Sequence, residues 1–393
     1  MLPLIIVAVI EVLTFLVIRE YLLNTSRRLF VNSLTINIML SVLLWAFIII
    51  TAAGGGTYDS PENVSNRMVL AGMICAVVVP RVLLIIFHYS GKLLRLRQGG
   101  HVKLVTGTGA VLSGVIFIVI VLGSTAGRFN FKREEITVKI DGLDPALRGL
   151  KIVHLSDMHL ACFYRHNKLL DRLMKEVSAL KPDLIINTGD FINYGWREFG
   201  RFDTILSKAQ GRYGNFAVLG NHDMGTYMLE ADDRIRENII QKMKEQITLS
   251  GYHLLNDENI LININGSTIA LTGVHTSGRH PDIFHGDLIR AMEGIENPDL
   301  KILLAHDPNQ WKKDVTGKTD INLTLSGHTH GMQMGILTKK IRWSPAQYFY
   351  PQWNGLYKDG EQYLYVNRGL GVLAIPFRIL MPPEITIINL TSD

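Results

Sequence analysis

Four long apolar runs dominate the first third of this 393-residue chain and constrain what it can fold into. Each run is close to the ~20 residues that a helix needs to cross ~30 Å of hydrocarbon. A helix packed on a soluble core is apolar on one face, whereas these runs are apolar all round. The first run lacks a basic start and an obvious cleavage site, so we interpret it as a retained helix rather than a signal peptide. The sequence therefore predicts four transmembrane helices, at residues 2–18, 34–53, 68–87 and 104–122.

The loops between these runs differ in charge. Seven Lys and Arg residues lie in the first and third loops, and one lies in the second. Short loops rich in Lys and Arg stay in the cytoplasm. The pattern predicts a multi-pass protein of the inner, or cell, membrane, with the second loop and the C-terminal domain extracytoplasmic. The same loops contribute to the net charge of +5, and because no basic helix or nucleic-acid motif appears, we expect no nucleic-acid partner.

Two charged residues interrupt the apolar runs, Glu11 in the first and Arg81 in the third. Charges inside a membrane are costly and are usually paired or functional. The two residues lie at similar distances from the cytoplasmic ends of their runs. This match favours an ion pair that fixes helix packing, and a lipid or proton site is the alternative.

Composition divides the chain into three parts: a transmembrane domain at 1–123, a linker at 124–135 and a C-terminal domain at 136–393. In the last part, short apolar segments alternate with segments of helical periodicity such as 166–180. This alternation argues for an α/β fold. We predict strands at 136–140, 152–155, 184–187, 216–219, 268–272, 302–305, 322–325, 363–366 and 385–389.

Polar residues follow five of these strands directly. Ligands of open α/β sheets bind just beyond the carboxyl ends of the strands. Carboxylate and imidazole groups together suit Mn, Fe or Zn, and an Asp can bridge two such cations. Two ions ~3.5–4 Å apart can clamp a phosphoryl group and activate a bridging water. The candidate residues are Asp157, His159, Asp190, Asn221, His222, Asp223, His306, Asp307, His328 and His330.

The order of these residues resembles a known family. Asp157-x-His159, Gly189-Asp190, Gly220-Asn221-His222-Asp223, His306 and Gly327-His328-x-His330 look like the five signature motifs of the calcineurin-like metallophosphoesterases. The resemblance runs from about residue 136 to the C-terminus. It implies a two-sheet α/β/β/α sandwich with phosphoesterase activity.

The resemblance also implies roles for individual residues. One metal is expected on Asp157, His159, Asp190 and His330, and the other on Asp190, Asn221, His306 and His328. His222 is expected to face the substrate and to protonate the leaving oxygen or stabilise the phosphoryl charge, with Asp223 orienting it. Manganese is expected in both positions, with iron or zinc as alternatives.

Later segments resemble the bacterial membrane-associated branch, which is similar to the UDP-2,3-diacylglucosamine pyrophosphatases. These segments are 331–333, 365–371 and 382–384. Two positions depart from the pattern, because Asn193 stands where relatives often have Asp and His275 stands where an acidic residue is expected. Neither residue is an expected metal ligand, so these departures affect the expected identity of the substrate and not the expected metal binding.

These features predict a membrane-anchored hydrolase of a lipid phosphate or lipid-linked pyrophosphate, with membrane lipids as partners. The linker of about a dozen residues keeps the domain near the bilayer. Aromatic residues between 343 and 357 follow the last motif and line a route to the metals in one interpretation, or pack a hairpin in the other. The alternative function is hydrolysis of a soluble phosphodiester or nucleotide, with the helices as an anchor only. The oligomeric state is not predicted.

Two further functions are disfavoured. A transporter is expected to show internal repeats or paired broken helices, and neither is evident in the sequence. A non-catalytic scaffold with a decayed site is expected to lack ligands, whereas all seven are present together with His222.

Overall fold

The computed structural model describes residues 2–23, 25–98, 102–228, 232–279, 282–338 and 340–392. The chain forms two compact units. One holds the residues up to Gly55 together with Asn66–Ala126 and Ala374–Phe377. The other holds Gly56–Ser65, Gly127–Leu373 and the residues from Arg378 onwards. The short segment Gly56–Ser65 therefore belongs to the second unit, although apolar helices flank it on both sides.

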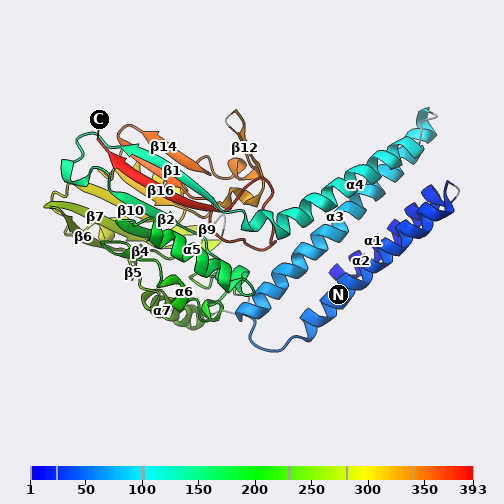
Figure 1. Ribbon diagram of the computed structural model, residues 1–393, viewed down its shortest axis with the longest axis horizontal. Helices are drawn as coiled ribbons and strands as arrows, with labels where there is room; N and C mark the ends of the chain where they lie inside the picture. The colour runs from blue at the N-terminus through cyan, green and yellow to red at the C-terminus, as the bar shows by residue number, and fades with distance from the viewer. Residues whose placement is uncertain are drawn as a thin grey trace. The chain divides into compact units, whose positions relative to one another are not determined.

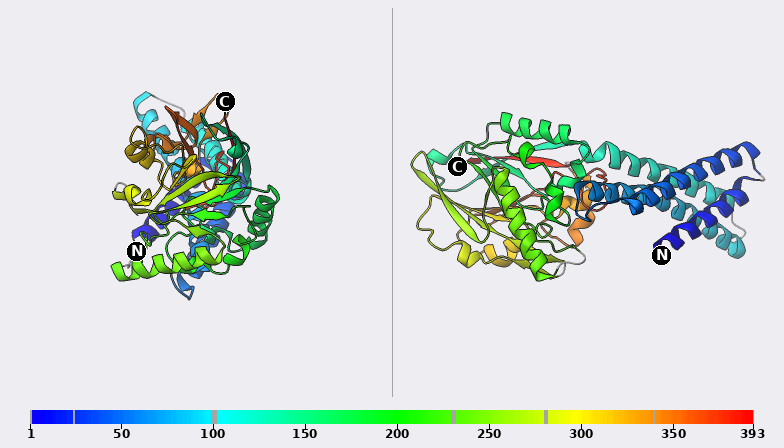
Figure 2. Two further views of the ribbon diagram at one scale, coloured as in Figure 1. Left: turned by 90° about the vertical axis from the view of Figure 1, so that its left-hand side faces the viewer. Right: turned by 90° about the horizontal axis from the view of Figure 1, so that it is seen from below.

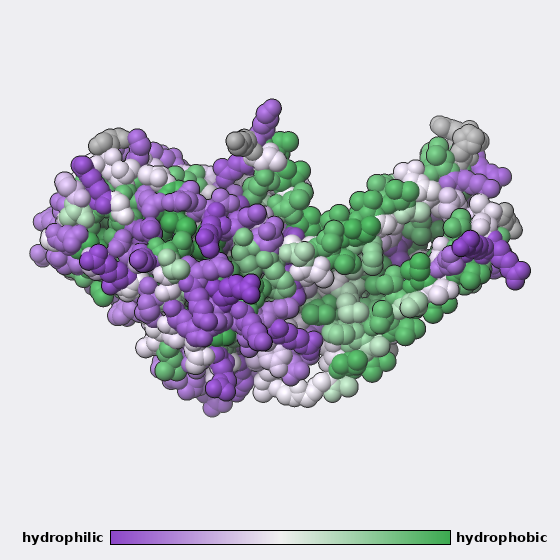
Figure 3. All heavy atoms as spheres, viewed as in Figure 1, coloured by the Kyte–Doolittle hydropathy of each residue, from purple (hydrophilic) through white to green (hydrophobic). Residues whose placement is uncertain are grey.

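The first unit consists of long helices, and four of those in the described residues are long and apolar enough to cross a membrane. The candidate membrane helices confirm the four predicted runs and extend each of them. Hydrophobic residues cover their surfaces, in contrast to the polar surface of the second unit (Figure 3). The helices are α1 (Leu2–Leu22), α2 (Arg27–Ala53), α3 (Pro61–Gln98) and α4 (Val102–Thr125) (Figure 1).

The predicted ion pair between Glu11 and Arg81 is confirmed. Arg81 Nη1 lies 3.2 Å from Glu11 Oε1, and Arg81 is nearly buried. The pair is part of a larger polar network, because Trp45 Nε1 donates to Glu11 Oε2 at 3.0 Å and Arg81 Nη2 donates to Ser41 Oγ at 2.8 Å. Arg81 also donates to the side chain and the carbonyl of Asn37. The network joins α1, α2 and α3 and satisfies charges that hydrocarbon would otherwise leave unpaired.

The second unit is built on two mixed six-stranded sheets among the described residues (Figure 1). In the first sheet the order is β1 (Lys132–Lys139), β16 (Glu384–Thr391), β2 (Lys151–Leu155), β3 (Leu184–Asn187), β4 (Asn215–Ala217) and β5 (His253–Leu254). In the second it is β14 (Gly355–Asp359), β15 (Gln362–Val366), β11 (Leu323–Ser326), β10 (Leu300–Ala305), β7 (Ser267–Val274) and β6 (Glu258–Ile264). Strands β2 to β5 run parallel, as do β7, β10, β11 and β15.

The main hydrophobic core lies between the two sheets. It contains residues from both, including Ile152, Ile186, Leu271, Leu304 and Leu325, all of which are fully buried. Burying such a side chain contributes about 1.5–3 kcal/mol relative to leaving it exposed. Helices also cover the outer faces of the two sheets. The strands of this core are therefore apolar on both faces.

Helices complete the outer layers (Figures 1 and 2). Helices α5 (Asn167–Ala179), α6 (Asp203–Leu206) and α7 (Asp233–Leu249) lie on the side of the first sheet, and α8 (Leu288–Ala291) lies on the second. In α5 the buried residues Leu170, Leu173, Met174 and Val177 are spaced as one helix face requires. The predicted two-sheet α/β arrangement is confirmed.

The structure also contains elements that the sequence analysis did not predict. These are α7, the edge strands β5, β6 and β14, and the hairpins β8 (Thr276–Arg279) with β9 (Asp282–His285) and β12 (Ile336–Leu337) with β13 (Arg342–Trp343). Strand β1 begins at Lys132, inside the segment interpreted as a linker, because it pairs with β16 along its whole length. The domain boundaries at 123 and 135 stay a prediction.

Candidate metal centre

The polar residues that follow the strands meet at one end of the two sheets. Asp157, Asp190 and Asn221 come after β2, β3 and β4 of the first sheet, and His306 and His328 come after β10 and β11 of the second. Parallel strands present their carboxyl ends at the same edge, which is where open α/β sheets bind ligands. The site therefore lies where both sheets end, and neither sheet alone supplies it.

The first group of ligand atoms comes from Asp157, His159 and His330, all buried. Their atoms lie within 4.8 Å of one another. His330 Nε2 is 3.1 Å from Asp157 Oδ1, and His159 Nε2 is 3.1 Å from His330 Nε2. Two ring nitrogens and a carboxylate oxygen thus converge on one point.

The second group comes from Asp190, His306 and His328, again within 4.8 Å. His306 Nε2 lies 3.1 Å from Asp190 Oδ2, and Asn221 Oδ1 lies 3.0 Å from His328 Nδ1. Asp190 Oδ2 is also 3.9 Å from His159 Nε2 of the first group. The Asp190 carboxylate therefore lies between the two groups, where one residue can serve both.

The protonation state of the histidine rings indicates whether these residues can bind cations. His159 Nδ1 lies 2.9 Å from the Ile192 carbonyl and His306 Nδ1 lies 2.6 Å from the Thr188 carbonyl. A ring that donates from Nδ1 presents a lone pair at Nε2, as metal ligands do. Burial holds the pKa of His159 well below its usual range, and it lowers the pKa of His328 to about 4. Both rings are therefore neutral and able to bind a cation.

The surroundings of His306 also fit a cation. Burial lowers the pKa of His306, but the carboxylates of Asp190 and Asp157 outweigh burial and raise the pKa to about 10. The two carboxylates therefore favour positive charge beside this ring, which a bound cation would supply. The donor set fits two divalent ions, which when bound would polarise a phosphoryl group and lower the pKa of a bridging water.

The backbone around the ligands is strained. Positive φ angles, which cost side-chain-bearing residues free energy, occur at five of the candidate ligands. They are Asp157 (48°), His159 (42°), Asp190 (57°), His328 (69°) and His330 (50°). Strain of about 1–3 kcal/mol per residue persists where the surrounding structure enforces it, and it concentrates at functional sites.

Two motif glycines permit the close approach of these segments. A Cβ at Gly220 would overlap the Asp190 carboxylate, and a Cβ at Gly327 would overlap Ser156 and the Asp157 carboxylate. Any side chain at either position would push a candidate ligand away. The glycines therefore belong to the metal centre although they supply no ligand atom.

His222 lies beside the first group, with its ring 5.1 Å from that of His159. Its Nδ1 is 2.7 Å from the Asn193 carbonyl, which leaves Nε2 for a substrate. The expected contact with Asp223 is absent among the described hydrogen bonds. Asp223 instead accepts from the backbone N–H groups of Asp190, Phe191, Ile192 and Gly220. Asp223 thus contacts the loop that carries Asp190, and the Asn193 carbonyl is the hydrogen-bond partner of His222 Nδ1. The expected role of Asp223 stays a prediction.

Two tyrosines at the site were not identified from the sequence. The hydroxyl of Tyr350 lies 2.8 Å from His328 Nε2, and the hydroxyl of Tyr227 accepts from Asn221 Nδ2 at 2.9 Å. The ring of Tyr227 also stacks on His222, with centroids 4.1 Å apart. Tyr350 falls in the aromatic stretch that the sequence analysis marked, whereas nothing in the sequence distinguishes Tyr227.

The fold and the centre define a metal-dependent phosphoester hydrolase. Residues 150–332 match the family model described as calcineurin-like phosphoesterase. The uncharacterized metallophosphoesterase YkuE of Bacillus subtilis is 30% identical over 262 residues, which cover 66% of this chain and 85% of that protein. The chain belongs to the calcineurin-like metallophosphoesterases, a family of metal-dependent hydrolases with a dinuclear metal site.

Other relatives carry membrane or lipid terms in their names. A transmembrane protein with metallophosphoesterase domain from Bos taurus is 30% identical over 64% of this chain, but that match covers only 55% of the bovine protein. The UDP-2,3-diacylglucosamine pyrophosphatase LpxG of Chlamydia muridarum is 28% identical over 62% of this chain and 84% of its own length. Among solved structures, a phosphopantetheinyl hydrolase from Mycobacterium tuberculosis is 12% identical, and the match covers 50% of this chain and 89% of that protein. Its TM-score is 0.31, too low to support an argument.

Proposed function

We propose that this protein hydrolyses a phosphoester or pyrophosphate bond of a lipid or lipid-linked substrate at the outer surface of the cell membrane. Two divalent ions, manganese first and iron or zinc as alternatives, would be held by the seven ligands assigned above. His222 would face the leaving oxygen through Nε2 and protonate it as it departs. Tyr227 would fix the positions of the His222 ring and the Asn221 side-chain amide.

An exposed apolar surface next to the centre is the observation that carries this proposal. Tyr348 is 72% exposed and Phe349 is 52% exposed, although both are large aromatic residues. They directly precede Tyr350, whose hydroxyl contacts His328. We call Trp343, Tyr348 and Phe349 the aromatic surface; all three are exposed, and Trp343 Nε1 lies 3.4 Å from the Tyr348 hydroxyl. Such a surface is typical of contact with a membrane or an apolar ligand.

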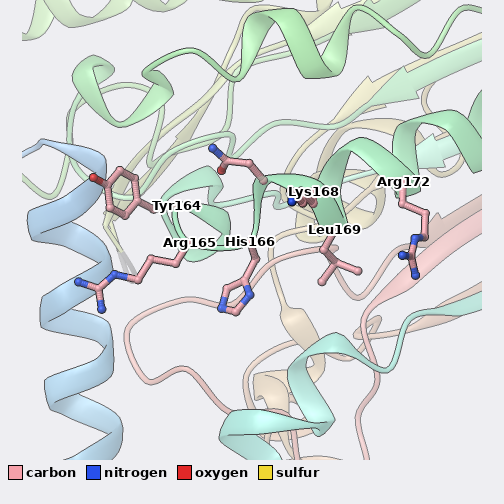
Figure 4. A pocket seen from close by; sticks show the side chains of 7 residues that line it. Tyr164, Arg165, His166, Lys168, Leu169 and Arg172 are labelled. Atoms are coloured by element: carbon pink, nitrogen blue, oxygen red, sulfur yellow. The ribbon is translucent and has the colours of Figure 1, made fainter.

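A cationic surface beside the start of α5 supports the same substrate class. A pocket of about 590 Å³ is lined by residues 164–169 and 172, among them Arg165, Lys168 and Arg172 (Figure 4). The ring of His166 packs on that of Phe129, four residues beyond the end of α4, with centroids 4.5 Å apart. The pocket is thus tied to the chain close to where it leaves a membrane helix. Positive charge in such a pocket favours an anionic headgroup.

The orientation bears on which lipid is cleaved. The basic first and third loops support an orientation with the catalytic unit outside the cytoplasm. LpxG is named for an acylated UDP-sugar, but UDP-linked precursors are scarce outside the cytoplasm. The proposal therefore favours a phospholipid, a polyprenyl phosphate or a lipid A-type headgroup over the acylated UDP-sugar.

The test compares kcat/KM for phosphatidic acid in detergent with kcat/KM for glycerol phosphate, in the purified full chain loaded with Mn²⁺. Since burial of a CH₂ group contributes about 0.8 kcal/mol, a lipid enzyme should lose orders of magnitude on the soluble headgroup. The double variant Tyr348→Ser/Phe349→Ser should lower activity on the lipid and leave activity on p-nitrophenyl phosphate unchanged. Leu249→Ser, which changes an exposed residue of α7, is the matched control.

The second candidate is a soluble phosphodiester or nucleotide, with the helices as an anchor only. Equal efficiency on lipid and headgroup, or a preference for free nucleotides, would refute the lipid substrate and leave the hydrolase intact.

A further inference from the structure

A buried carboxylate holds the loop that orients His222. Glu198 is fully buried and accepts four N–H groups from the segment Asn193–Gly195. Its Oε2 accepts from the backbone N and the side-chain Nδ2 of Asn193, at 2.9 and 2.8 Å. Its Oε1 accepts from the backbone N of Tyr194 and of Gly195. Burial raises the pKa of Glu198 to about 7, and the four donors stabilise its ionised form against that cost.

The same loop carries the acceptor of the His222 ring. The Asn193 carbonyl lies 2.7 Å from His222 Nδ1. Glu198 accepts from the Tyr194 N–H, which lies in the same peptide group as the Asn193 carbonyl, and from the Asn193 side chain. The direction of this carbonyl therefore depends on Glu198. The carbonyl in turn decides whether Nε2 of His222 points at the leaving oxygen.

A residue from the segment between α2 and α3 covers this loop. Asp59 is 1% exposed, and its carboxylate lies 3.4 Å from Arg197 Nη1. A Cβ at Gly195 would overlap the Asp59 side chain. The segment Gly56–Ser65 belongs to the same compact unit as the metal centre. Asp59 therefore packs directly against the loop at Gly195 and pairs with Arg197.

We infer that Glu198 is a positioning residue for His222 and that Asp59, from the segment joining two membrane helices, completes the same support. The catalytic unit would then need the segment Gly56–Ser65, which lies far from the other residues of the centre in sequence, for full activity. The inference rests on the proposed role of His222 as the acid for the leaving oxygen. It also explains why position 193 is Asn: an Asp there would place two buried carboxylates against each other.

The test measures how kcat depends on the leaving group. Phenyl phosphate has a poor leaving group and needs a proton from His222, whereas p-nitrophenyl phosphate needs it far less. His222→Ala should therefore lower kcat on phenyl phosphate more than on the nitrophenyl ester. Glu198→Gln places an amide N–H group against N–H donors, so it should show the same selective loss, by about a hundredfold at most, with metal content unchanged.

Rescue separates positioning from general damage. In the double variant Asn193→Asp/Glu198→Gln, the Gln amide can donate to the Asp carboxylate, so the selective loss should be partly reversed. Gly195→Ala pushes Asp59 away while keeping the Glu198 side chain and the N–H of position 195, so it should give a smaller loss of the same kind. Glu176→Gln, which removes a charge from a surface pair with Arg133, is the matched control.

The outcomes distinguish the two hypotheses. If His222→Ala loses activity equally on both esters, the acid role of His222 is wrong and the inference falls with it. If His222→Ala is selective but Glu198→Gln is not, or if Glu198→Gln loses metal, the positioning role is overturned while the proposed function stands. If Gly195→Ala behaves as the wild type, Asp59 has no part in the support.

Discussion

The hydroxyl oxygen of Tyr350 lies 2.8 Å from Nε2 of His328, while Nδ1 of the same ring faces Asn221 and the second group of ligand atoms. If Nδ1 is to bind a metal, Nε2 must carry the proton and donate it to Tyr350. Tyr350→Phe would leave that N–H buried without an acceptor. We expect metal affinity at the second position to fall about 10- to 100-fold, as is typical when the partner of a ligating histidine is removed.

Metal content after dialysis against graded Mn²⁺ concentrations measures this change. Tyr348→Phe is the control, because the Tyr348 hydroxyl contacts Trp343 and its side chain is largely exposed. Unchanged metal binding in Tyr350→Phe would mean that His328 needs no outer partner.

Substitutions of Asp190 and of His222 should have different effects on metal content and on kcat. Asp190→Asn is expected to abolish metal loading and activity together, because Asp190 lies between the two groups. His222→Ala should keep both metals and lose about 10²–10⁴ in kcat, the usual contribution of a positioned general acid. Metal analysis and rate measurements on the two purified variants separate these effects. Loss of metal from the His222→Ala variant would contradict the role of His222 as a general acid that binds no metal.

The ligand motifs were predictable because they are local in sequence. Each lies within a few residues of a strand end, so strand prediction alone brought Asp157, Asp190 and His306 to one edge. The orientation of His222 was not predictable in this way. It depends on the Asn193 carbonyl and on Glu198, and no residue type marks a backbone carbonyl as an acceptor.

The missed elements also have physical reasons. Helix α7 was not predicted because only Ile239, Met243 and Ile247 of its seventeen residues are buried, which leaves a narrow apolar stripe. Hairpin β12–β13 consists of two-residue strands, too short for an alternating pattern to appear. The membrane helices were the easiest to predict, because their length and uniform apolarity have no soluble counterpart.

Inside the membrane unit, neutralising one partner of the Glu11–Arg81 pair should lower stability more than neutralising both partners. Arg81→Met leaves Glu11 without its cation and should cost about 3–5 kcal/mol, whereas Glu11→Gln/Arg81→Met should cost less than the sum of the single changes. Exchanging the two charges should not restore stability, because Arg81 also donates to Ser41 and to the Asn37 carbonyl.

The midpoint of thermal unfolding in nanodiscs reports these differences. The pair of Glu20 and Lys92 provides the control, because both side chains are substantially exposed and such pairs contribute about 0–1 kcal/mol. Additive effects of the two substitutions would show that Glu11 and Arg81 do not stabilise each other.

The orientation of the catalytic unit can be tested with single cysteines. The two native cysteines interfere little, since Cys162 is buried and Cys75 lies within α3. Leu249→Cys places a thiol on a residue of the catalytic unit that is 64% exposed. Thr25→Cys places one in the first loop, where the neighbouring Arg27 and Arg28 favour the cytoplasm. A maleimide that does not cross the inner membrane should label Leu249→Cys in intact spheroplasts and Thr25→Cys only after the membrane is opened. The reverse pattern would place the centre in the cytoplasm, where acylated UDP-sugars again become the favoured lipid substrate.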